Sequence, residues 1–364
     1  MSTKNQFSPD YVIHPGEILG ETLQARGISY NELAARCEVS PKHVSSIING
    51  KSPITPDTAV MLERILDLKA SFWLKLDSDY KLFIQREEEI KKLEAAITWA
   101  RKFPIKELVF RGFLPTTTSD SKLVAALLDF FNVGSVGAWE KQYADMAVQF
   151  RKSINKTDTT NDENIAAWLK IGENKAKEIP TATFSKHQFK SALQKIRTLT
   201  IKTPTEFAPE LVKICAENGV AIVFVKEFPK TKICGATYWL GGEKAILMLS
   251  LRYSWADIFW FTFFHEAGHL LLHSKDSLIV DGNELSGNTR EDEANDFAAN
   301  TLIPPEQYKS FLLEYARPDK SAITSFAKTL NIAPGIIVGR LQKEGRIPYS
   351  WFNDLRERYG IKID

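Results

Sequence analysis

Apolar residues in the first part of the chain recur at helical spacing, in short runs with their own start and stop signals. Serines stand where helix N-caps are favoured, prolines where first turns are favoured, and glycines after the expected helix ends: Ser29, Ser40, Pro41, Pro56, Gly27 and Gly50. These signals predict four helices, over residues 15–26, 30–37, 41–49 and 56–66. Their apolar positions can face one small shared core: Leu33, Ala34, Val39, Val44, Ile47 and Ile48. The pattern therefore indicates a small all-helical N-terminal domain.

The pattern stays helical in the middle of the chain but carries no legible chemistry. Residues 71–102 read as one long helix whose glutamates 87–89 precede lysines 91 and 92, which is typical of a solvated helix face. Residues 115–121 and 155–162 have the composition of loops, and helical periodicity continues to about residue 218. We interpret this region as a helical connector or docking module.

Beyond residue 218 the pattern changes to short runs of β-branched and aromatic residues. Three runs predict strands, over residues 219–225, 234–240 and 245–251. A helix follows over residues 254–273, which Ser254 and Asp257 could open as a capping box. The whole reads as an α+β protein, mostly helical. Three parts are expected: an N-terminal all-α domain (1–70), a helical middle region (71–217), and a C-terminal domain (218–364) with a small sheet.

Composition and charge indicate the class of the protein and the compartment in which it is expected. The 364 residues exceed one ordinary core, and 44% hydrophobic with 25% charged residues is typical of a soluble globular protein. A net charge of +2 means that any nucleic-acid binding must come from a local basic face. Three scattered cysteines argue against a disulfide framework, and no segment has the length and apolarity of a signal peptide or membrane span. We expect a cytoplasmic protein with no membrane segment.

Three of the six histidines fall within the nine residues HEAGHLLLH. His265 and His269 are four apart on the predicted helix, so both rings can bind one zinc ion at about 2 Å. Glu266 is placed to take a proton from water and pass it to a leaving amine. His273 lies another turn along, about 12 Å from His265 by helix rise, and cannot join the same ion. The alternative reading, hydrogen-bonded core histidines, is the less favoured one.

A catalytic zinc ion usually has a third protein ligand and one open position. The next predicted helix, TREDEANDFAANTLIPP, supplies acidic candidates, among which spacing alone does not choose: Glu291, Asp292, Glu293 and Asp296. The donor set of two histidines and a carboxylate favours Zn²⁺, although metal affinity alone does not fix which ion is bound.

The strings HEAGHLLLH and EDEANDFAANTLIPP resemble the ImmA/IrrE family of metallopeptidases, over roughly residues 218–305. The resemblance implies a zincin-like domain with a gluzincin-like site. It makes His265 and His269 metal ligands and Glu266 the catalytic base, and it points to Glu293 as the third ligand, with Glu291 as the fallback. In zincins an edge strand holds extended substrate, and residues 245–251 are a candidate for that strand.

The N-terminal string LAARCEVSPKHVSSIINGK resembles the Xre/Cro-C1 helix-turn-helix, and HPGEIL is similar to the start of HigA-type antitoxins. The resemblance covers about residues 14–70 and implies binding to double-stranded operator DNA, normally as a homodimer. Carried over by position, three side chains would face bases and one would meet phosphate: Lys42, His43 and Ser46, then Lys51. Glu38 stands where the family usually has glycine in the turn, at a cost of about 1 kcal/mol for positive φ.

Together these features predict a DNA-binding transcriptional regulator with a zinc-dependent endopeptidase domain that cleaves a repressor or antitoxin-type partner. The substrate class comes from the resemblance alone. A second hypothesis is an antitoxin-like regulator whose peptidase-like domain senses or binds without proteolysis. A third is a peptidase whose N-terminal part docks protein instead of DNA.

Overall fold

The structure, a computed structural model, describes residues 12–143, 162–229, 231, 233–242, 244–250, 252, 254–273, 279–282 and 289–359. The chain forms two compact units, residues 1–97 with 118–124 and residues 98–117 with 125–364. The expected fold class, a mostly helical α+β protein, is confirmed. The expected division at residues 70 and 217 differs from the two units, for reasons that lie in the packing of individual helices.

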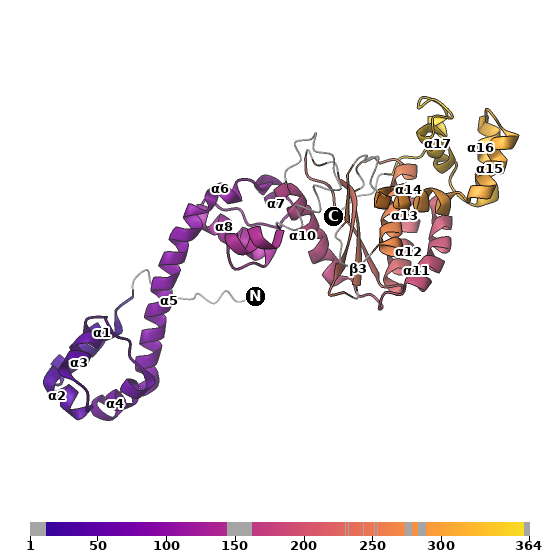
Figure 1. The fold of residues 1–364 in the computed structure, drawn as a ribbon. Helices are drawn as coiled ribbons and strands as arrows, with labels where there is room; N and C mark the ends of the chain where they lie inside the picture. The colour runs from indigo at the N-terminus through magenta and orange to yellow at the C-terminus, as the bar shows by residue number, and fades with distance from the viewer. Residues whose placement is uncertain are drawn as a thin grey trace. The chain divides into compact units, whose positions relative to one another are not determined.

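The first unit contains a five-helix domain (Figure 1). Its helices are α1 (Pro15–Ala25), α2 (Tyr30–Arg36), α3 (Pro41–Ile48), α4 (Pro56–Leu66) and α5 (Ala70–Ala95). The first four agree with the predicted helices to within one residue. Ser29 and Ser40 are N-caps, whose hydroxyls accept from the amides of Glu32 and His43. The shared core includes Leu33, Val44 and Ile47, as predicted.

The first and last residues of the sequence HPG, at the start of α1, each have a structural role. The His14 ring is the N-cap, and its Nδ1 accepts from the amide of Gly16 at 2.9 Å. A Cβ on Gly16 would come within 2.3 Å of the carbonyl oxygen of Ile47, at the end of α3. Only glycine therefore allows α1 to approach α3 this closely.

The long helix begins where the sequence predicts but ends earlier. α5 stops at Ala95, and a short helix, α6 (Ile97–Ala100), follows it. Trp73, near the start of α5, is fully buried in the core of the N-terminal domain. Because α5 completes that core, the first domain extends beyond residue 70.

The second unit is built around a four-stranded sheet. Its strands are β1 (Val220–Phe224), β2 (Ile233–Leu240), β3 (Lys244–Leu249) and β4 (Ile279–Gly282), in the order β1-β3-β2-β4. β3 runs parallel to β1 and antiparallel to β2, and β2 runs antiparallel to β4. The hypothesis that residues 245–251 form the substrate-holding edge is wrong, because β3 is hydrogen-bonded on both sides.

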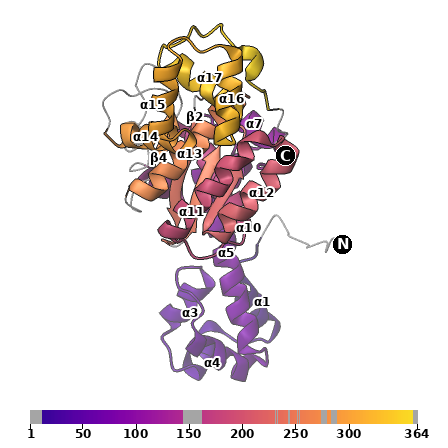
Figure 2. The ribbon, with the colours of Figure 1, turned by 90° about the vertical axis from the view of Figure 1, so that its right-hand side faces the viewer.

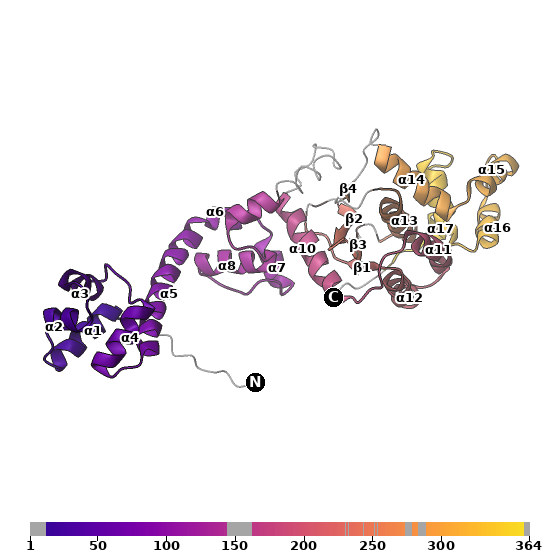
Figure 3. The same ribbon diagram turned by 60° about the horizontal axis from the view of Figure 1, so that its bottom comes forward.

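Helices cover both faces of the sheet (Figures 1 and 3). α10 (Asp162–Glu178) lies on one face, and a Cβ on its Gly172 would be 2.1 Å from Met248 Cε of β3. The Nζ of Lys244 donates to the carbonyls of Ala176 and Ile179, at the end of α10. On the other face lie α11 (Lys186–Arg197), the 3-10 turn Thr198–Ile201, α12 (Pro204–Glu217) and α13 (Ala256–Leu272). α10, α11 and α12, which precede residue 218, thus belong to the fold that carries the sheet.

An aromatic cluster organises the segment before α10. α7 (Ile105–Phe110) and α8 (Asp120–Phe131) lie here. The ring of Trp139 packs edge to face with those of Trp99, Phe103 and Phe131, and the rings of Phe103 and Phe131 pack at a tilt. By length and composition alone, the stretch Asp120–Tyr143, with a mean hydropathy of 1.2, could cross a membrane, and so could the bent helix pair Lys320–Leu330 and Pro334–Lys343 if it is taken as one span. Asn132, at φ 56°, interrupts the first of these stretches. The contact between the rings of Phe131 and Trp139 shows that this stretch is part of a packed core.

The C-terminal helices pack on the side of α13 (Figure 2). They are α14 (Thr289–Leu302), α15 (Pro305–Glu314), α16 (Lys320–Leu330) and α17 (Pro334–Lys343), followed by the 3-10 turn Asn353–Leu355. Arg340 donates to the carbonyls of Ala299 and Ile303 and so satisfies the end of α14. This contact fixes α14 at the position from which it reaches the candidate metal centre.

Candidate metal centre

The helix that carries HEAGH is buried along most of its length. α13 begins at Ala256, and the predicted capping box does not form. Ser254 has φ 54° and its carbonyl accepts from the amide of Tyr359, while the amide of Ala256 donates to Glu357. Backbone groups of the C-terminal segment therefore form the hydrogen bonds at the start of α13 that the sequence analysis assigned to a side chain.

Asp257, the other half of the predicted box, has a different partner. Its carboxylate accepts from Nε of Arg356 at 3.1 Å and from Nη2 at 2.8 Å. Burial raises the pKa of Asp257, and the hydrogen bonds and charge of Arg356 oppose that rise. The two-point ion pair ties the first turn of α13 to the C-terminal segment.

Three donor atoms converge between α13 and α14. The Nε2 atoms of His265 and His269 lie 2.9 Å apart. An oxygen of Glu291 is 3.2 Å from Nε2 of His265, and its other oxygen is 3.6 Å from Nε2 of His269. Ligands at 2.0–2.1 Å from a tetrahedral zinc ion are separated by about 3.3 Å, so the three residues fit this ion. Within the part of the chain that the structure describes, His265, His269 and Glu291 are the one group of at least three ligand-type side chains close enough together to hold a metal ion.

Glu291 occupies the position that the resemblance gave to Glu293. Along α14, Glu291 lies on the buried face with Ala294, Ala298 and Leu302, at helical spacing. Glu293 is two residues on and about 200° around the helix, with 61% of its side chain exposed. The prediction of Glu293 as third ligand is therefore corrected to Glu291. The backward extension of that buried face was the signal that could have shown it.

Glu293 and His273 form a second layer behind the donors. Oε2 of Glu293 lies 3.1 Å from Nε2 of His273, and Nδ1 of His273 lies 2.9 Å from Nδ1 of His269. A carboxylate accepts only, so Nε2 of His273 carries the proton and Nδ1 accepts from His269. His269 then presents an unprotonated Nε2 to the centre, as a metal ligand must.

The second histidine is held in the same tautomer. Nδ1 of His265 lies 3.0 Å from Oδ1 of Asn295, one turn beyond Glu291 on α14. Because the amide oxygen accepts a hydrogen bond, Nδ1 of His265 carries the proton. Its unprotonated Nε2 faces the other two candidate metal ligands. Sequence reasoning missed Asn295, although the string EAN contains it.

Burial and hydrogen bonding set the charges of the donors. Burial lowers the pKa of His269 to about 4, and the neighbouring histidines act in the same direction against Glu291. Burial alone would raise the pKa of Glu291, but its contacts with the imidazole rings of His265 and His269 lower it to about 2. At neutral pH the site therefore offers a neutral His269 and an anionic carboxylate, the forms that bind a divalent cation.

Glu266 is fully buried against β2. A Cβ on Gly235 would come within 2.4 Å of Oε1 of Glu266, so glycine at this point of the strand makes room for the carboxylate. Gly268 serves the other side of α13, where a Cβ would be 3.1 Å from Phe297 and 3.4 Å from Ala294 of α14. Sequence reasoning missed Gly235.

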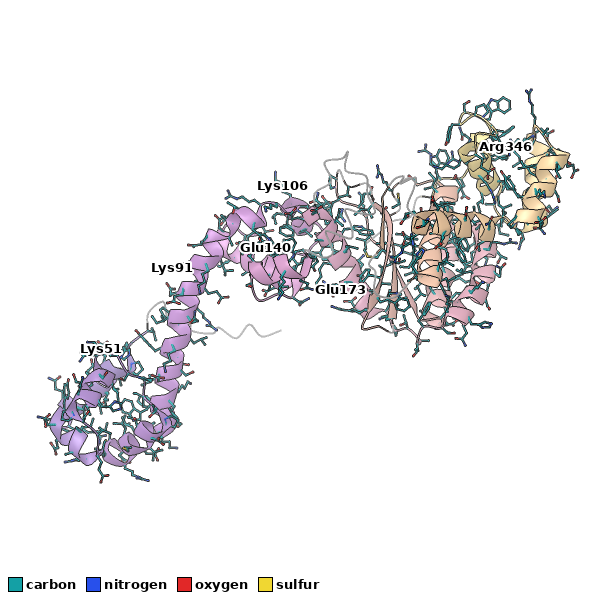
Figure 4. All side chains as sticks on the ribbon, in the orientation of Figure 1. Lys51, Lys91, Lys106, Glu140, Glu173 and Arg346 are labelled. Atoms are coloured by element: carbon teal, nitrogen blue, oxygen red, sulfur yellow. The ribbon has the colours of Figure 1, made fainter. Side chains whose placement is uncertain are left out.

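The predicted DNA-contacting residues lie on or next to α3. Lys42 and Lys51 are exposed, and His43 is half-buried (Figure 4 labels Lys51). Ser46 is half-buried, and its hydroxyl lies 2.9 Å from that of Ser52. Its carbonyl also accepts from the amides of Lys51 and Ser52, so Ser46 helps to end the helix.

Glu38, in the turn between α2 and α3, adopts φ 54°. The left-handed conformation expected where the family has glycine is therefore present.

Comparison with known proteins gives two separate matches. Residues 19–73 match the family model described as "Helix-turn-helix", and residues 223–342 match a peptidase-family model described as "IrrE N-terminal-like domain". Virulence-associated protein I of Dichelobacter nodosus is 37% identical over 78 residues, which are 21% of this chain and 72% of that protein.

Solved structures resemble the N-terminal end. A HigA-family addiction module antidote protein from Coxiella burnetii is 37% identical, covering 23% of this chain and 91% of that one, with a TM-score of 0.22. Pseudomonas aeruginosa antitoxin HigA with the higBA promoter is also 37% identical, covering 23% and 94%, with a TM-score of 0.22. The chain belongs to the helix-turn-helix family through its N-terminal domain, and it carries a metallopeptidase-like IrrE N-terminal-like domain in its C-terminal unit.

Proposed function

We propose that this protein is a DNA-binding transcriptional regulator whose C-terminal domain is a zinc-dependent endopeptidase. One observation carries the catalytic part. Donor atoms of His265, His269 and Glu291 lie 2.9–3.6 Å from one another, and the buried carboxylate of Glu266 follows His265 on the same helix. Structural histidines hydrogen-bonded to the protein would not need three acceptor groups aimed at one point.

Each residue has a distinct task in this proposal. His265, His269 and Glu291 hold the zinc ion, which when bound supplies Lewis-acid activation of water and of the peptide carbonyl. Glu266 takes the proton of the attacking water and delivers it to the leaving amine. Asn295 and His273 hold the ligand rings in the tautomer that leaves Nε2 unprotonated. The burial of Glu266 excludes competing water from the proton transfer.

The N-terminal domain would bring the protein to an operator in double-stranded DNA. α3 is the second helix of the helix-turn-helix, and in such folds this helix lies in the major groove. Lys42, His43 and Ser46 are proposed to meet base edges, and the exposed Lys51 a phosphate. Two copies reading two half-sites would be the working form, and the protein would act in the cytoplasm.

The substrate proposed is a protein, a repressor or an antitoxin-type partner. The experiment uses full-length protein loaded with one equivalent of zinc and incubated with the repressor or antitoxin encoded beside it. Wild type should cleave the partner, and Glu266→Gln should lower the rate by about a thousandfold. Asp292→Asn is the matched control, because Asp292 is exposed on α14 and outside the donor set.

Equal cleavage by Glu266→Gln and wild type would end the catalytic proposal. Operator binding that chelators leave unchanged, with no cleavage of any neighbouring gene product, would support instead a regulator whose peptidase-like domain binds without turnover. A gel shift with Lys42→Ala and Lys51→Ala tests the DNA part separately. Unchanged binding of operator DNA by both variants would contradict the proposed DNA face.

A further inference from the structure

One side of α5 carries apolar residues that the core of the N-terminal domain and the metal centre leave unexplained. The first and fourth positions of a seven-residue repeat are apolar here at five places: Phe72, Leu76, Phe83, Ile90 and Leu93. Phe72 and Ile90 each leave 41% of their surface exposed. The repeat extends along about 32 Å of helix. Such a stripe on a long helix is typical of a face that packs against another helix.

The N-terminal domain packs against a different side of α5. Trp73 is fully buried in the core of that domain. The ring of Tyr80 contacts the ring of His14 edge to face, with centroids 4.6 Å apart. Trp73 and Tyr80 lie roughly 100° around the helix from the centre of the apolar stripe. Leu76 borders both sides, because it also packs against the domain core. The rest of the stripe lies outside this core.

Two charged residues complete the repeat. Asp79 and Arg86 occupy its two remaining positions between residues 72 and 93, and they lie on either side of its midpoint. We call residues 72, 76, 79, 83, 86, 90 and 93 the α5 seam. Lys75 and Glu89 border the seam, again on either side of the midpoint and with opposite charges. All four charged residues are exposed, and none forms an ion pair with another residue that the structure describes.

The order of these charges favours one partner and one direction. Two parallel copies of the helix would set Asp79 against Asp79 and Arg86 against Arg86, and like charges across a helix pair are destabilising. Two antiparallel copies would instead bring Asp79 of one copy towards Arg86 of the other, and Lys75 towards Glu89. A twofold axis at the midpoint of the seam makes each of these contacts twice. The seam is therefore complementary to its own reversed copy.

We propose that the α5 seam binds the same seam of a second copy of this chain, with the two helices antiparallel and Asp79 paired with Arg86 across the interface. The apolar side chains of both seams are then buried between the helices, with Phe83 next to the twofold axis. The inference rests on the proposed function in one respect, because it supplies the interface for the two-copy form that reads two half-sites. It uses neither the metal centre nor the DNA-contacting residues.

Sedimentation equilibrium of the full-length protein, without DNA, tests the interface. Wild type should be dimeric at micromolar concentrations. Ile90→Glu should raise the dissociation constant of the dimer at least about 100-fold, because each copy would place a carboxylate in the apolar seam. Ile84→Glu is the matched control, because Ile84 is 40% exposed, against 41% for Ile90, and lies about 120° around the helix from it. It should leave the dissociation constant within about twofold of wild type.

Charge exchange tests the antiparallel direction. Asp79→Arg alone and Arg86→Asp alone should each weaken the dimer at least about tenfold, because either change opposes like charges across the seam. The variant that carries both changes should return to the wild-type dissociation constant, because opposite charges meet again. In a parallel pair the same double variant would still oppose like charges. Lys92→Glu, at an exposed residue on the far side of α5, should have no effect.

A monomeric wild type, equal effects of Ile90→Glu and Ile84→Glu, or a double charge variant no tighter than the single ones would overturn the inference. Circular dichroism checks that each variant is folded. The exposed positions of Asp79 and Arg86 keep the charge test valid even if Ile90→Glu lowers stability. Failure of the proposed function looks different. The dimer would form and depend on the seam, while the protein bound no operator DNA and cleaved no partner.

Discussion

Nδ1 of His273 lies 2.9 Å from Nδ1 of His269, while Nε2 of His269 faces His265 and Glu291. The same His273 ring reaches Glu293 through its other nitrogen. A carboxylate, an imidazole and a metal-binding imidazole thus form one hydrogen-bonded line that ends at the candidate centre. Glu293 therefore reaches the candidate centre only through His273 and His269, although its place in the sequence suggests a metal ligand.

Because of this arrangement, substitutions of Glu291 and Glu293 should have different effects on zinc binding. Glu291→Gln should abolish stoichiometric zinc binding, because it removes the anionic donor. Glu293→Gln and His273→Phe should each weaken zinc binding by about 10- to 100-fold, because they loosen the hold on the His269 tautomer. Competition with a chromogenic chelator measures both effects, with Asp292→Asn as the control. Equal losses from Glu291→Gln and Glu293→Gln would contradict the assigned roles.

Gly235 should be essential for activity but not for metal binding. In Gly235→Ala the new Cβ would come within 2.4 Å of Oε1 of Glu266, so the carboxylate must move. We expect cleavage to fall at least about a hundredfold, while zinc content stays at that of wild type. Gly242→Ala, at a turn where a Cβ has open space, is a control for the addition of a methyl group, although its positive φ adds strain. Loss of zinc from Gly235→Ala would show that the strand positions the ligands instead.

Local signals in the sequence were enough to predict the first four helices of the N-terminal domain and three strands of the sheet. Caps and glycines there act within a few residues, so Ser29 and Ser40 could be read directly. The start of α13 could not be read this way, because its partners come from about 100 residues later: Glu357, Tyr359 and Arg356. The order of the strands also depends on distant contacts, which is why the interior position of β3 escaped prediction. The pair His265 and His269 was predictable because one helix sets their spacing, and the third donor lies on another helix.

Breaking the ion pair between Asp257 and Arg356 should destabilise the second unit. Both side chains are about nine-tenths buried, with 7% and 11% exposed, so removal of either partner leaves an uncompensated charge. Arg356→Met should lower the free energy of unfolding by about 3 kcal/mol. Asp257→Asn with Arg356→Met should recover part of that loss. Denaturant unfolding of the zinc-free protein measures it, and a double variant less stable than Arg356→Met would argue against an isolated pair.

The stability of the zinc-free protein should depend on pH through His269. The unfolded chain protonates this residue near its ordinary pKa of 6.5, whereas burial delays protonation in the folded state to about 4. The unfolded state therefore binds the proton first, so stability is full above pH 6.5 and falls as the pH is lowered towards 4. At pH 5 wild type should have lost about 2 kcal/mol relative to His269→Asn, each compared with its own value at pH 7.5. Denaturant unfolding with a chelator measures the difference, and His187→Asn, at an exposed histidine of α11, should follow wild type. An equal loss in wild type and His269→Asn would contradict the assignment to this ring.

The turn of the helix-turn-helix carries a strain that one substitution can remove. Glu38 holds φ 54°, a conformation that costs a residue with a Cβ about 1 kcal/mol and glycine almost nothing. Glu38→Gly should therefore raise the stability of the first unit by up to about 1 kcal/mol, less the added flexibility of the unfolded chain. It should also strengthen operator binding at low salt, because it removes a negative charge next to α3. Glu38→Gln separates the two effects: it removes the charge and keeps the strain, so it should improve DNA binding without stabilising the unit. Thermal unfolding and gel shifts at two salt concentrations measure these outcomes. Equal melting temperatures for Glu38→Gly and Glu38→Gln would show that the backbone at this position is not under strain.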